Sequence, residues 1–442
     1  MDLKAVAREI FLQAIKAADP YMGVKKAVSF DGYTLTISGK TYPVDRYPRI
    51  LVVGAGKASA HMGRAIEDIL GEHVSDGWIN TKYDHAVHLK RIKVHECGHP
   101  VPDESGRQGT EQIVKLLTSV DEHTLVICLL SGGGSALMPA PAEGITLKEK
   151  QEVTHLLLNA GAAIKELNAV RKHLSIIKGG GMARLTSPGK LHVLILSDVI
   201  GDRLDTIASG PAVADGSTYQ DCIDICTRYN VMNVLPPRVL ERFIRGVCGE
   251  IPETAKEGDA FLASVTNTLI GNNSVSVESA REKAEKLGFN TMVLTTVLEG
   301  EAAEMGTVFT AIATEIIKSG NPIPVPACII AGGETTVTVK GNGKGGRNQE
   351  MALSAAVRLV GVPNVAFLSG GTDGTDGPTD AAGGIVDGTT VISGKEKDLD
   401  VLQFLERNDS YNYLKRVNGL LMTGPTGTNV MDIQILLVGE PE

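Results

Sequence analysis

The segment AGGETTVTVKGNGKGGRNQEMALSAA, residues 331–356, carries the combination of residues most informative about chemistry. A short apolar run ends in Gly332, Gly333 and Glu334, and a loop of Gly, Asn and Lys leads to Arg347 at the start of a predicted helix. Glycines let a backbone approach a ligand closely, and the amino end of a helix attracts anions. An arginine placed there can hold phosphate or carboxylate through two hydrogen bonds. The segment therefore predicts an anion-binding site.

Lys57 follows a second glycine-rich strand end, VVGAGKASA at residues 52–60. This segment is not a complete dinucleotide fingerprint, because Ser59 stands at the third glycine position and no acidic residue ends the next strand. It also lacks the spacing of a Walker A motif. A lysine in the first turn of a helix is unfavourable beside the helix dipole unless an anion lies nearby. We therefore expect Lys57 to contact an anion; the alternative is a solvated lysine on a tight turn.

The segment SGGGSALMPAP, residues 131–141, offers free backbone N–H groups and two hydroxyls. It is not a nucleophile elbow, because Leu137 stands where the last glycine of that motif would be. Consecutive backbone donors of this kind cradle phosphate or carboxylate. The predicted substrate- or phosphate-binding residues are Ser131, Gly132, Gly133, Gly134 and Ser135. The alternative is a tight turn between a strand and a loop.

Asp198 and His99 are two further candidates at strand ends. Asp198 ends the apolar run before VIGDRLDTIASGP, where a carboxylate can hold Mg²⁺ or accept a proton from the substrate. His99, in GHPVPDESG, is expected to contact the substrate. A turn or helix-capping role is the alternative for Asp198, and a structural turn histidine is the alternative for His99.

The segment SGGTDGTDGPTDAAGGIVDG, residues 369–388, adds four aspartates after another apolar strand. Their spacing does not fit an EF-hand, and single Asp-Gly pairs are often plain turns. Asp373 is the best placed of them for a metal or a nucleotide, as a metal candidate together with Asp198. The predicted nucleotide-binding residues are Gly332, Gly333, Glu334, Gly370, Gly371, Thr372 and Asp373.

These segments share residue types that suit the transfer of a phosphoryl group. They supply backbone donors, one lysine, one arginine and several carboxylates, without a serine or cysteine nucleophile constellation. Phosphoryl transfer needs positive groups on the transferred group, carboxylates for Mg²⁺ and positioning. The net charge of −9 and the aromatic content of 4% argue against a nucleic-acid partner, since no basic stripe or base-stacking surface is present.

The apolar periodicity predicts two α/β domains, residues 1–250 and 251–442. In the first, apolar strands alternate with helices, which predicts a Rossmann-like, doubly wound and mostly parallel sheet covered on both faces. The second is expected to hold a mixed sheet. A helix over residues 168–184 and a strand over 335–340 are among the predicted elements. In open α/β sheets, ligands bind at the edge where these glycine-ended strands finish.

No signal peptide, transit peptide or membrane span is predicted. The first 15 residues form an amphipathic helical pattern, and the only long uncharged run, residues 125–142, contains three glycines and two prolines. Cys222 and Cys226 suit one helix face, but no second ligand pair completes a zinc set. Cys128 and Cys328 lie in predicted strands and are expected to be buried. We therefore expect reduced thiols and a cytoplasmic protein.

Nine segments together resemble the class II glycerate kinase, or glycerate 2-kinase, family over nearly the whole chain. They are GAGKAS, GHPVPDESG, LLSGGGSAL, LNAVRKHLSIIKGGG, SDVIGD, ASGP, AGGETTVTVKGNGKGGRNQE, LSGGTDGTDGPTDAAGG and TGPTGTNVMD. The region of about 325–436 resembles the family's MOFRL domain. The resemblance implies ATP- and Mg²⁺-dependent phosphorylation of D-glycerate to 2-phosphoglycerate, in a cleft between the two domains. It also carries the family's proposed active-site lysine onto Lys57 and its arginine onto Arg347.

For a reaction of this kind, we assign hypothetical roles to the candidate residues. Residues 131–135 and Lys57 are expected to hold the glycerate carboxylate and the incoming phosphoryl group, and Arg347 to stabilise that group's equatorial oxygens. Asp198 is expected to orient or deprotonate the 2-hydroxyl, or to help hold Mg²⁺. Asp373, with Glu334 as a second candidate, is expected to serve the metal–nucleotide. The GNGKGG loop is expected to bring Arg347 onto ATP when the domains close.

Two other classes of protein stay open. An NAD(P)H-dependent hydroxypyruvate reductase is disfavoured by the incomplete fingerprint at residues 52–60 and the missing ribose-binding acid. A non-catalytic ligand-binding protein is disfavoured by the number of glycine-ended strands. The position of phosphorylation depends on the resemblance alone. The oligomeric state is open, with a homodimer as one candidate.

Overall fold

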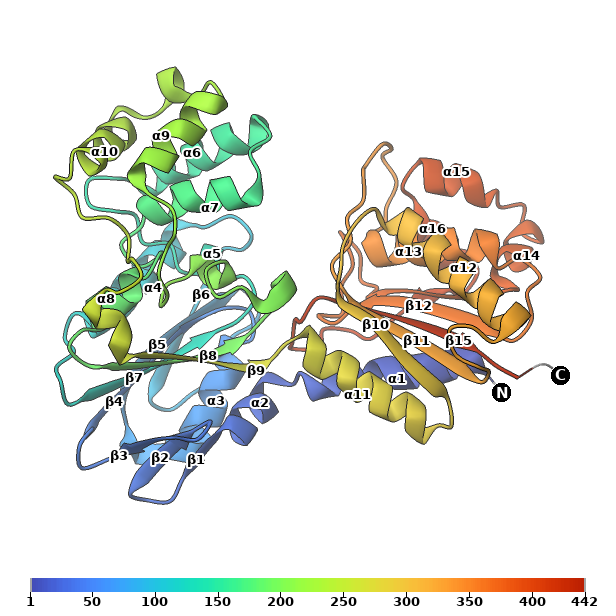
Figure 1. The fold of residues 1–442 in the computed structure, drawn as a ribbon, viewed down its shortest axis with the longest axis horizontal. Helices are drawn as coiled ribbons and strands as arrows, with labels where there is room; N and C mark the ends of the chain where they lie inside the picture. Colours follow the sequence, from blue (N-terminus) through green and yellow to red (C-terminus); the bar gives the residue numbers. More distant parts are fainter. Residues whose placement is uncertain (1, 441–442) are drawn as a thin grey trace. The chain divides into compact units, whose positions relative to one another are not determined.

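The computed structural model of the chain describes residues 2–440. It divides into two compact units: residues 20–270, here the first unit, and residues 1–19 with 271–442, here the second unit (Figure 1). Each unit is built around its own sheet, and the N-terminal helix α1 (Leu3–Ala17) belongs to the second. The α/β fold class predicted from the sequence is therefore confirmed.

The division differs from the predicted boundary at residue 250 in two places. Residues 251–270 remain with the first unit, because strand β9 (Val265–Gly271) extends the sheet of that unit. Helix α1 belongs to the second unit, because Ile10 and Phe11 are fully buried in the core of the second sheet. Both corrections come from contacts between residues that are distant in the sequence.

The first unit contains a six-stranded sheet in which parallel pairing predominates. Strands β6, β5, β4, β7 and β8 are paired in parallel in that order, and β9 lies beside β8 at the edge. The bounds of these five parallel strands are Ile92–Cys97 for β6, Val74–Lys82 for β5, Arg49–Ala55 for β4, Thr124–Leu130 for β7 and Lys190–Leu196 for β8. The carboxyl ends of these five strands therefore lie at one edge, where the glycine-rich segments follow them.

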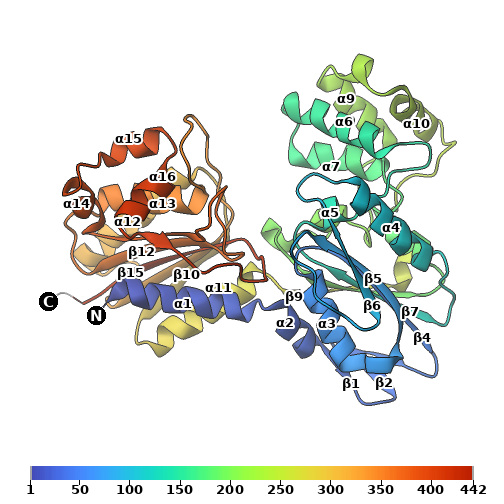
Figure 2. The ribbon, with the colours of Figure 1, turned by 180° about the vertical axis from the view of Figure 1, so that it is seen from behind.

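Helices cover both faces of this sheet (Figures 1 and 2). Leu51 and Val53 of β4 pack with Ile113 and Leu117 of α4 (Glu104–Leu117) in one buried cluster. Helix α3 (Ser59–Leu70) packs against β4, β5 and β7. Strands buried on both faces have uninterrupted apolar sequences, as in LVVGA of β4 and TLVICLL of β7.

Two smaller parts complete the first unit. Helix α2 (Pro20–Ala27) leads to a three-stranded antiparallel sheet of β1 (Val28–Phe30), β2 (Thr34–Ile37) and β3 (Lys40–Pro43). A helical group with its own apolar core is formed by two helices that follow β7 and two that follow β8. Its helices are α6 (Leu147–Asn159), α7 (Ile164–His173), α9 (Tyr219–Arg228) and α10 (Pro237–Val247). Thr146 caps α6 through a capping box with Glu149.

The helix predicted over residues 168–184 is interrupted. Helix α7 ends at His173, and α8 (Gly181–Thr186) begins only after the run Gly179, Gly180 and Gly181. Gly179 and Gly180 have φ angles of +54° and +76°, in the left-handed region that favours glycine. The intervening turn redirects the chain and brings Lys178 toward the end of the sheet.

The second unit contains the mixed sheet that was predicted, in the order β10-β11-β15-β12-β13-β14. Strands β10 and β11 are parallel, and the remaining neighbours are antiparallel. Their bounds are Asn290–Leu298 for β10, Ala327–Gly333 for β11, Asp432–Val438 for β15, Val365–Gly371 for β12, Gly383–Asp387 for β13 and Leu420–Leu421 for β14. Strands β13 and β14 were not predicted.

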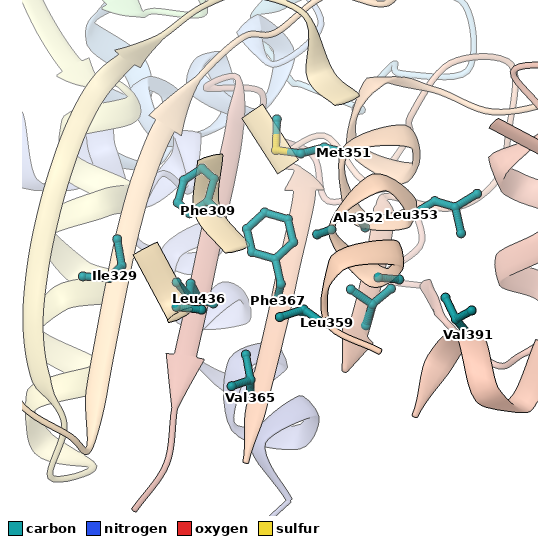
Figure 3. Close-up of a cluster of buried hydrophobic side chains, with 14 of the residues drawn as sticks. Phe309, Ile329, Met351, Ala352, Leu353, Leu359, Val365, Phe367, Val391 and Leu436 are labelled. Carbon is teal, nitrogen blue, oxygen red and sulfur yellow. The ribbon is translucent and has the colours of Figure 1, made fainter. Parts of the chain in front are cut away.

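Helices cover this sheet on both sides. Helices α1 and α11 (Asn273–Lys286) lie side by side on one face, as Figure 2 shows. On the other face lie α12 (Ala302–Ser319), α13 (Arg347–Arg358), α14 (Thr390–Lys395), α15 (Val401–Glu406) and α16 (Ser410–Arg416). The core beneath them centres on Phe309 and Phe367, whose ring centroids are 5.0 Å apart (Figure 3). This packing fixes α13, and with it Arg347, relative to the strand ends.

The strand predicted over residues 335–340 is wrong. Only Thr336 forms a bridge there, with Glu301, and the segment is otherwise irregular. Its backbone is instead held by side chains: Glu301 accepts from the Thr338 N–H at 3.0 Å, and Asn408 accepts from the Lys340 N–H at 2.7 Å. The β-branched residues thus indicated extended backbone but not a sheet partner.

Cys128 and Cys328 are buried in strands, as predicted. Cys97 is also buried, and burial raises the pKa of its thiol to about 12. The cysteines are free thiols, and Cys222 and Cys226 are buried. Between residues 2 and 440, no helix combines the length and apolarity needed to cross a membrane.

Candidate active site

The first group of candidate residues lies where β4, β7 and β8 end. Ala55 pairs with Leu130, and Leu130 pairs with Ile195, so the three parallel strands finish level with one another. The residues that follow them are Lys57, Ser131 and Asp198. The shared edge brings the loops after β4, β7 and β8 together, as expected for an open parallel sheet.

Lys57 and the loop of residues 131–135 are joined through the backbone. The Lys57 N–H donates to the Gly132 carbonyl at 2.9 Å, and the Ala58 N–H donates to Ser131 Oγ at 3.0 Å. Ser131 Oγ also lies 3.1 Å from Ser59 Oγ. Helix α3 begins at Ser59, so Lys57 precedes the helix rather than lying in its first turn. The lysine side chain is half-buried at the junction of the two loops.

The surroundings of Lys57 are positive. Burial lowers the pKa of His99 to about 4, with Lys57, Lys82 and His85 adding to the effect. Burial and Lys82 also lower the pKa of His85. Both histidines are therefore neutral near pH 7 beside two lysines. Lys82 and His85 were not among the predicted site residues; the position of Lys82 at the end of a predicted strand was the available signal.

His99 packs directly against the loop of residues 131–135. Gly133 has a φ of +83°, and a Cβ built there would lie 2.8 Å from His99 Cδ2. Gly133 is therefore needed both for its backbone conformation and for the approach of the imidazole. The structure places His99 beside the predicted phosphate- or substrate-binding loop.

Ser135, at the other end of this loop, is held by a buried lysine. Lys178 Nζ donates to Ser135 Oγ at 2.7 Å and to the Ser135 carbonyl at 2.8 Å, and Ser135 Oγ lies 2.9 Å from Ser209 Oγ. Ala208 and Ser209 have φ angles of +49° and +61°, a strained conformation for residues other than glycine. Burial moves the pKa of Lys178 well below its usual value, helped by Lys150 and other cations. Lys178 was missed because it falls within the helix predicted over residues 168–184.

The second group of candidates surrounds Asp432. Gly333 at the end of β11 and Gly371 at the end of β12 both pair with Asp432, the first residue of β15. The Asp432 side chain is fully buried. Glu334 and Thr372 therefore follow strand ends that flank one buried carboxylate. Asp432 was not predicted individually, since an aspartate before an apolar strand has no distinctive local pattern.

Arg347 lies between Asp432 and Glu334. Its Nε and Nη2 donate to the two Asp432 carboxylate oxygens at 2.5 and 2.8 Å, and its Nη1 lies 2.9 Å from Glu334 Oε1. Burial acts to lower the pKa of Arg347, but Asp432 and Glu334 outweigh it and raise the pKa. Burial raises the pKa of Asp432, against the influence of Arg347. The guanidinium is thus held in a fixed orientation by a two-point ion pair.

The amino end of α13 is not an open anion site, contrary to the prediction. Asp376 accepts hydrogen bonds from the Asn348 and Gln349 N–H groups at 3.2 and 2.8 Å. The carboxylate of Asp376 therefore already provides the negative charge that the helix dipole favours. Burial raises the pKa of Asp376 to about 6, with Asp432 adding to the effect.

The predicted nucleotide-binding residues divide into packed and accessible positions. A Cβ at Gly332 would lie 1.8 Å from Asn273 Oδ1, so this glycine allows close packing against α11. Thr372 is fully buried, and its hydroxyl donates to the Met431 carbonyl at 2.6 Å and accepts from the Val430 N–H at 2.8 Å. Glu334 has 42% of its side chain exposed, and Asp373 is half-buried, with Oδ1 accepting from the Thr375 N–H at 3.0 Å.

The other aspartates of residues 369–388 have separate contacts. Asp380 accepts from the Tyr411 hydroxyl at 2.7 Å, and Asp387 forms an ion pair with Lys4 at 2.8 Å. Asp373 remains at the strand end. The local cluster in the sequence is therefore dispersed by the fold.

The GNGKGG loop before Arg347 is anchored. The Gly341 N–H donates to Asn408 Oδ1 at 3.0 Å, and the Lys344 N–H donates to Asp409 Oδ1 at 2.8 Å. The Tyr411 N–H donates to the Lys344 carbonyl at 2.9 Å. The high glycine content thus serves close packing against the turn before α16, in addition to any freedom of the loop.

A dedicated metal cage is not formed by the part of the chain that the structure describes. No group of three or more His, Cys, Asp or Glu side chains in residues 2–440 is arranged to hold a metal ion. Asp198 and Asp373 belong to different units. Mg²⁺ that is bound together with nucleotide phosphates usually takes only one or two protein carboxylates, and water supplies other ligands. The carboxylates of Asp373 and Glu334, near Asp432 and Arg347, fit that requirement.

Comparisons with known proteins cover both units. Residues 6–244 match a domain of unknown function (DUF4147), and residues 327–432 match the MOFRL family. The chain is 46% identical to a glycerate 2-kinase of Pyrococcus horikoshii, with 99% of this chain and 98% of that protein covered. It is 39% identical to a protein of Agrobacterium vitis that carries a provisional hydroxypyruvate reductase name, with 99% and 94% covered. The crystal structure of a glycerate kinase of Thermotoga maritima has a TM-score of 0.88 and 42% identity, with 99% of each chain covered.

Proposed function

The chain belongs to the glycerate kinase family with a C-terminal MOFRL domain, and we propose that it transfers the γ-phosphoryl group of ATP to the 2-hydroxyl of D-glycerate. The 46% identity to a glycerate 2-kinase supports both the substrate and the position of transfer. The structural observation that carries the proposal is the loop of residues 131–135. One end of the loop is bonded to the Lys57 backbone, and the other is bonded to the Lys178 ammonium. Backbone donors among positive groups suit an anionic substrate and a developing negative charge.

The first unit is proposed to bind glycerate and the transferred group. Lys57 neutralises charge on the phosphoryl oxygens, and the loop of residues 131–135 positions the substrate. Asp198, after β8 at the same sheet edge, accepts the proton of the 2-hydroxyl. In the transfer, the bond between the γ-phosphorus and the β–γ bridging oxygen breaks, the bond from phosphorus to the 2-oxygen forms, and ADP leaves with the electron pair.

The second unit is proposed to serve the nucleotide. Arg347, held by Asp432 and Glu334, presents a fixed positive charge to the equatorial oxygens of the γ-phosphoryl group. Asp373 and Glu334 are the carboxylates that would hold Mg²⁺ with the nucleotide. Bound Mg²⁺ would supply neutralisation of charge on the phosphate oxygens. Gly370 and Gly371 support this site by backbone packing rather than by side chains.

Product analysis tests the proposal directly. Purified protein is incubated with D-glycerate and MgATP, ADP formation is followed in a coupled assay, and ³¹P NMR identifies the phosphorylated carbon. We expect ADP and 2-phosphoglycerate in equal amounts. Formation of 3-phosphoglycerate would contradict the assignment to the 2-hydroxyl but leave a kinase.

A parallel assay with hydroxypyruvate and NADH addresses the reductase alternative. We expect no oxidation of NADH, because the loop after β4 lacks the third glycine of the fingerprint and β5 ends in Thr81 and Lys82 rather than an acid. NADH oxidation without ATP consumption would overturn the proposal. Turnover in neither assay would favour a ligand-binding protein.

A further inference from the structure

A cavity of about 340 Å³ lies within the first unit beside the loop of residues 131–135. Its walls come from the segment after β6, from α5 (Gly134–Leu137), and from α6 and α7. Ser135 lines the cavity on the side of the loop, and Pro100, Pro102 and Leu147 form apolar wall. The cavity is therefore continuous with the segment that the proposed function assigns to substrate positioning.

Lys150, on α6, is a buried cation in this wall. Only 7% of the residue is exposed, and its Nζ has no hydrogen-bond partner among the residues that the structure describes. A buried ammonium without a partner is strongly unfavourable. Lys150 therefore either loses its proton or gains an opposite charge from a ligand, because no acidic side chain of the described residues lines the cavity beside it.

Two further cations line the same cavity. Arg171 comes from α7 and Lys178 from the turn after it. Lys178 already donates to Ser135, which leaves Lys150 and Arg171 as the charges available to a ligand. No acidic residue is among the described residues that line the cavity. Asp215, a nearby buried acid, is used by Lys172 at 3.1 Å and by Ser217.

Two of the basic residues at this cavity belong to one glycine-ended segment of the chain. Arg171, Lys172 and Lys178 all lie in LNAVRKHLSIIKGGG, one of the segments that resemble the glycerate kinase family. The interruption between α7 and α8 turns Lys178 toward Ser135 while α7 presents Arg171 to the cavity. The segment therefore contributes side chains to a site as well as to the fold.

We propose that this cavity holds the carboxylate of the D-glycerate substrate, with Lys150 and Arg171 as its charged contacts. The inference rests on the proposed kinase function and adds the residues that select a carboxylate-bearing substrate. A planar guanidinium matches a carboxylate through two parallel hydrogen bonds, and the ammonium supplies a second charge. The apolar part of the wall lowers the local dielectric constant, which strengthens both interactions. The adjacent 2-hydroxyl then lies toward the loop of residues 131–135.

The protonation of Lys150 provides a second signature. Burial lowers the pKa of Lys150 to about 7, with Arg171 and Arg242 adding to the effect. The charged groups around it are Arg171 and Lys178 across the cavity, Arg242 from α10, and the exposed His155 on its own helix. A bound carboxylate favours the charged ammonium, so binding takes up a proton when the pH exceeds about 7. Affinity for glycerate consequently falls as the pH rises from 7 to 9.

The test compares Lys150→Met with Lys148→Met, an exposed lysine on the same helix. Isothermal titration calorimetry measures D-glycerate binding without ATP, and the coupled assay measures KM for glycerate and for ATP. We expect Lys150→Met to weaken glycerate binding and raise its KM by about 10–100-fold, the usual effect of losing a charged hydrogen bond. KM for ATP should stay within about twofold, and Tm should be unchanged or higher, because an unpaired buried charge is removed. Lys148→Met should change none of these quantities.

Glyceramide, the neutral amide of glycerate, separates charge recognition from a general packing effect. Wild-type protein should prefer glycerate strongly, and Lys150→Met should lose most of that preference together with the fall in affinity above pH 7. Unchanged glycerate binding in Lys150→Met, or an unchanged preference over glyceramide, would overturn the inference. If inorganic phosphate binds the cavity more tightly than glycerate does, the ligand of the cavity is a phosphate group and the carboxylate inference is overturned. Absence of turnover with intact, Lys150-dependent glycerate binding would instead count against the proposed kinase function alone.

Discussion

The two groups of strand ends use the same backbone pattern with opposite charge. In the first unit, glycine-rich loops after β4 and β7 lie beside Lys57, Lys82 and Lys178, and the pKa of His99 is lowered so that it stays neutral. In the second unit, the glycines after β11 and β12 surround the buried Asp432. One arginine there is shared between Asp432 and Glu334.

This difference separates two properties of such a site. Paired glycines at a strand end permit close approach of backbone or ligand, but they do not determine the sign of the ligand's charge. That sign is determined by side chains that other elements bring to the same edge. The positive group suits an anionic acid and the phosphoryl group in transfer, while the acidic group suits a metal-bound nucleotide beside one oriented arginine.

The largest expected effects are losses of catalytic activity on removal of Lys57 or Arg347, which lie in surroundings of opposite charge. Lys57→Ala and Arg347→Ala should each lower kcat/KM by about 10²–10⁴-fold, the usual loss for a group that stabilises developing charge. Because both are proposed to act on one transferred group, the double variant should lose much less than the product of the two losses. Steady-state kinetics measures this, with the exposed Lys26→Ala as control. Losses below about threefold in both single variants would remove these residues from the proposed chemistry.

The next effect tests whether Arg347 depends on Asp432. Asp432→Asn leaves the guanidinium without its buried partner and should lower the free energy of unfolding by about 2–4 kcal/mol, after allowance for the one-third exposure of Arg347. Glu334→Gln removes a partner that is 42% exposed and should lower it by less than about 1 kcal/mol. Urea unfolding followed by circular dichroism gives both values. Equal losses would show that burial does not distinguish the two partners.

A pH dependence should distinguish the acidic group from the positive one. The pKa of Asp376 is raised to about 6 in the folded protein, above the usual 3.8, so the folded state binds the proton more tightly. Its contribution therefore makes the protein less stable as the pH rises from about 4 to 6, by up to about 3 kcal/mol. The difference in unfolding free energy between wild type and Asp376→Asn should change across that window and be flat above it. A difference independent of pH would rule out this titration.

The smallest effect separates packed from ligand-facing residues within the predicted nucleotide site. Thr372→Val removes a hydroxyl bonded to the Met431 carbonyl and the Val430 N–H, and should destabilise by about 1–2 kcal/mol. KM for MgATP should stay within about twofold. Asp373→Asn should instead raise KM for MgATP on the order of tenfold with little change in stability. A large rise of KM in Thr372→Val would place its hydroxyl on the nucleotide.

Most of the fold could be predicted from local sequence patterns. Uninterrupted apolar runs identified β4, β7, β8, β11, β12 and β15, and the 3.6-residue periodicity identified the helices that cover them. The errors are at residues 168–184 and 335–340, and at the short strands β13 and β14. The first error has a local cause, the positive φ angles of Gly179 and Gly180. In the other two, the deciding contacts come from distant residues: Asn408 holds the segment near Lys340, and Leu421 and Gly383 pair across the β13–β14 edge.

The candidate site could be predicted from the sequence to a similar extent. Lys57, Asp198 and residues 131–135 follow strands that the sequence identified, and parallel neighbours bring such ends together. Lys150 resembles any surface lysine of an amphipathic helix, and Asp432 resembles any residue before a strand. Their burial depends on which helix and which strands pack around them, and local sequence does not contain that information.

The sequence by itself determined the α/β class, the glycine-ended strands and the resemblance to a kinase family, because these depend on local periodicity and on long contiguous motifs. The tertiary structure alone decided that α1 packs in the second unit, that Asp376 caps α13, and that Arg347 is held by Asp432. It also decided that Lys150 and Arg171 line one cavity. These properties depend on which distant residues are buried against one another, and only the folded chain determines that.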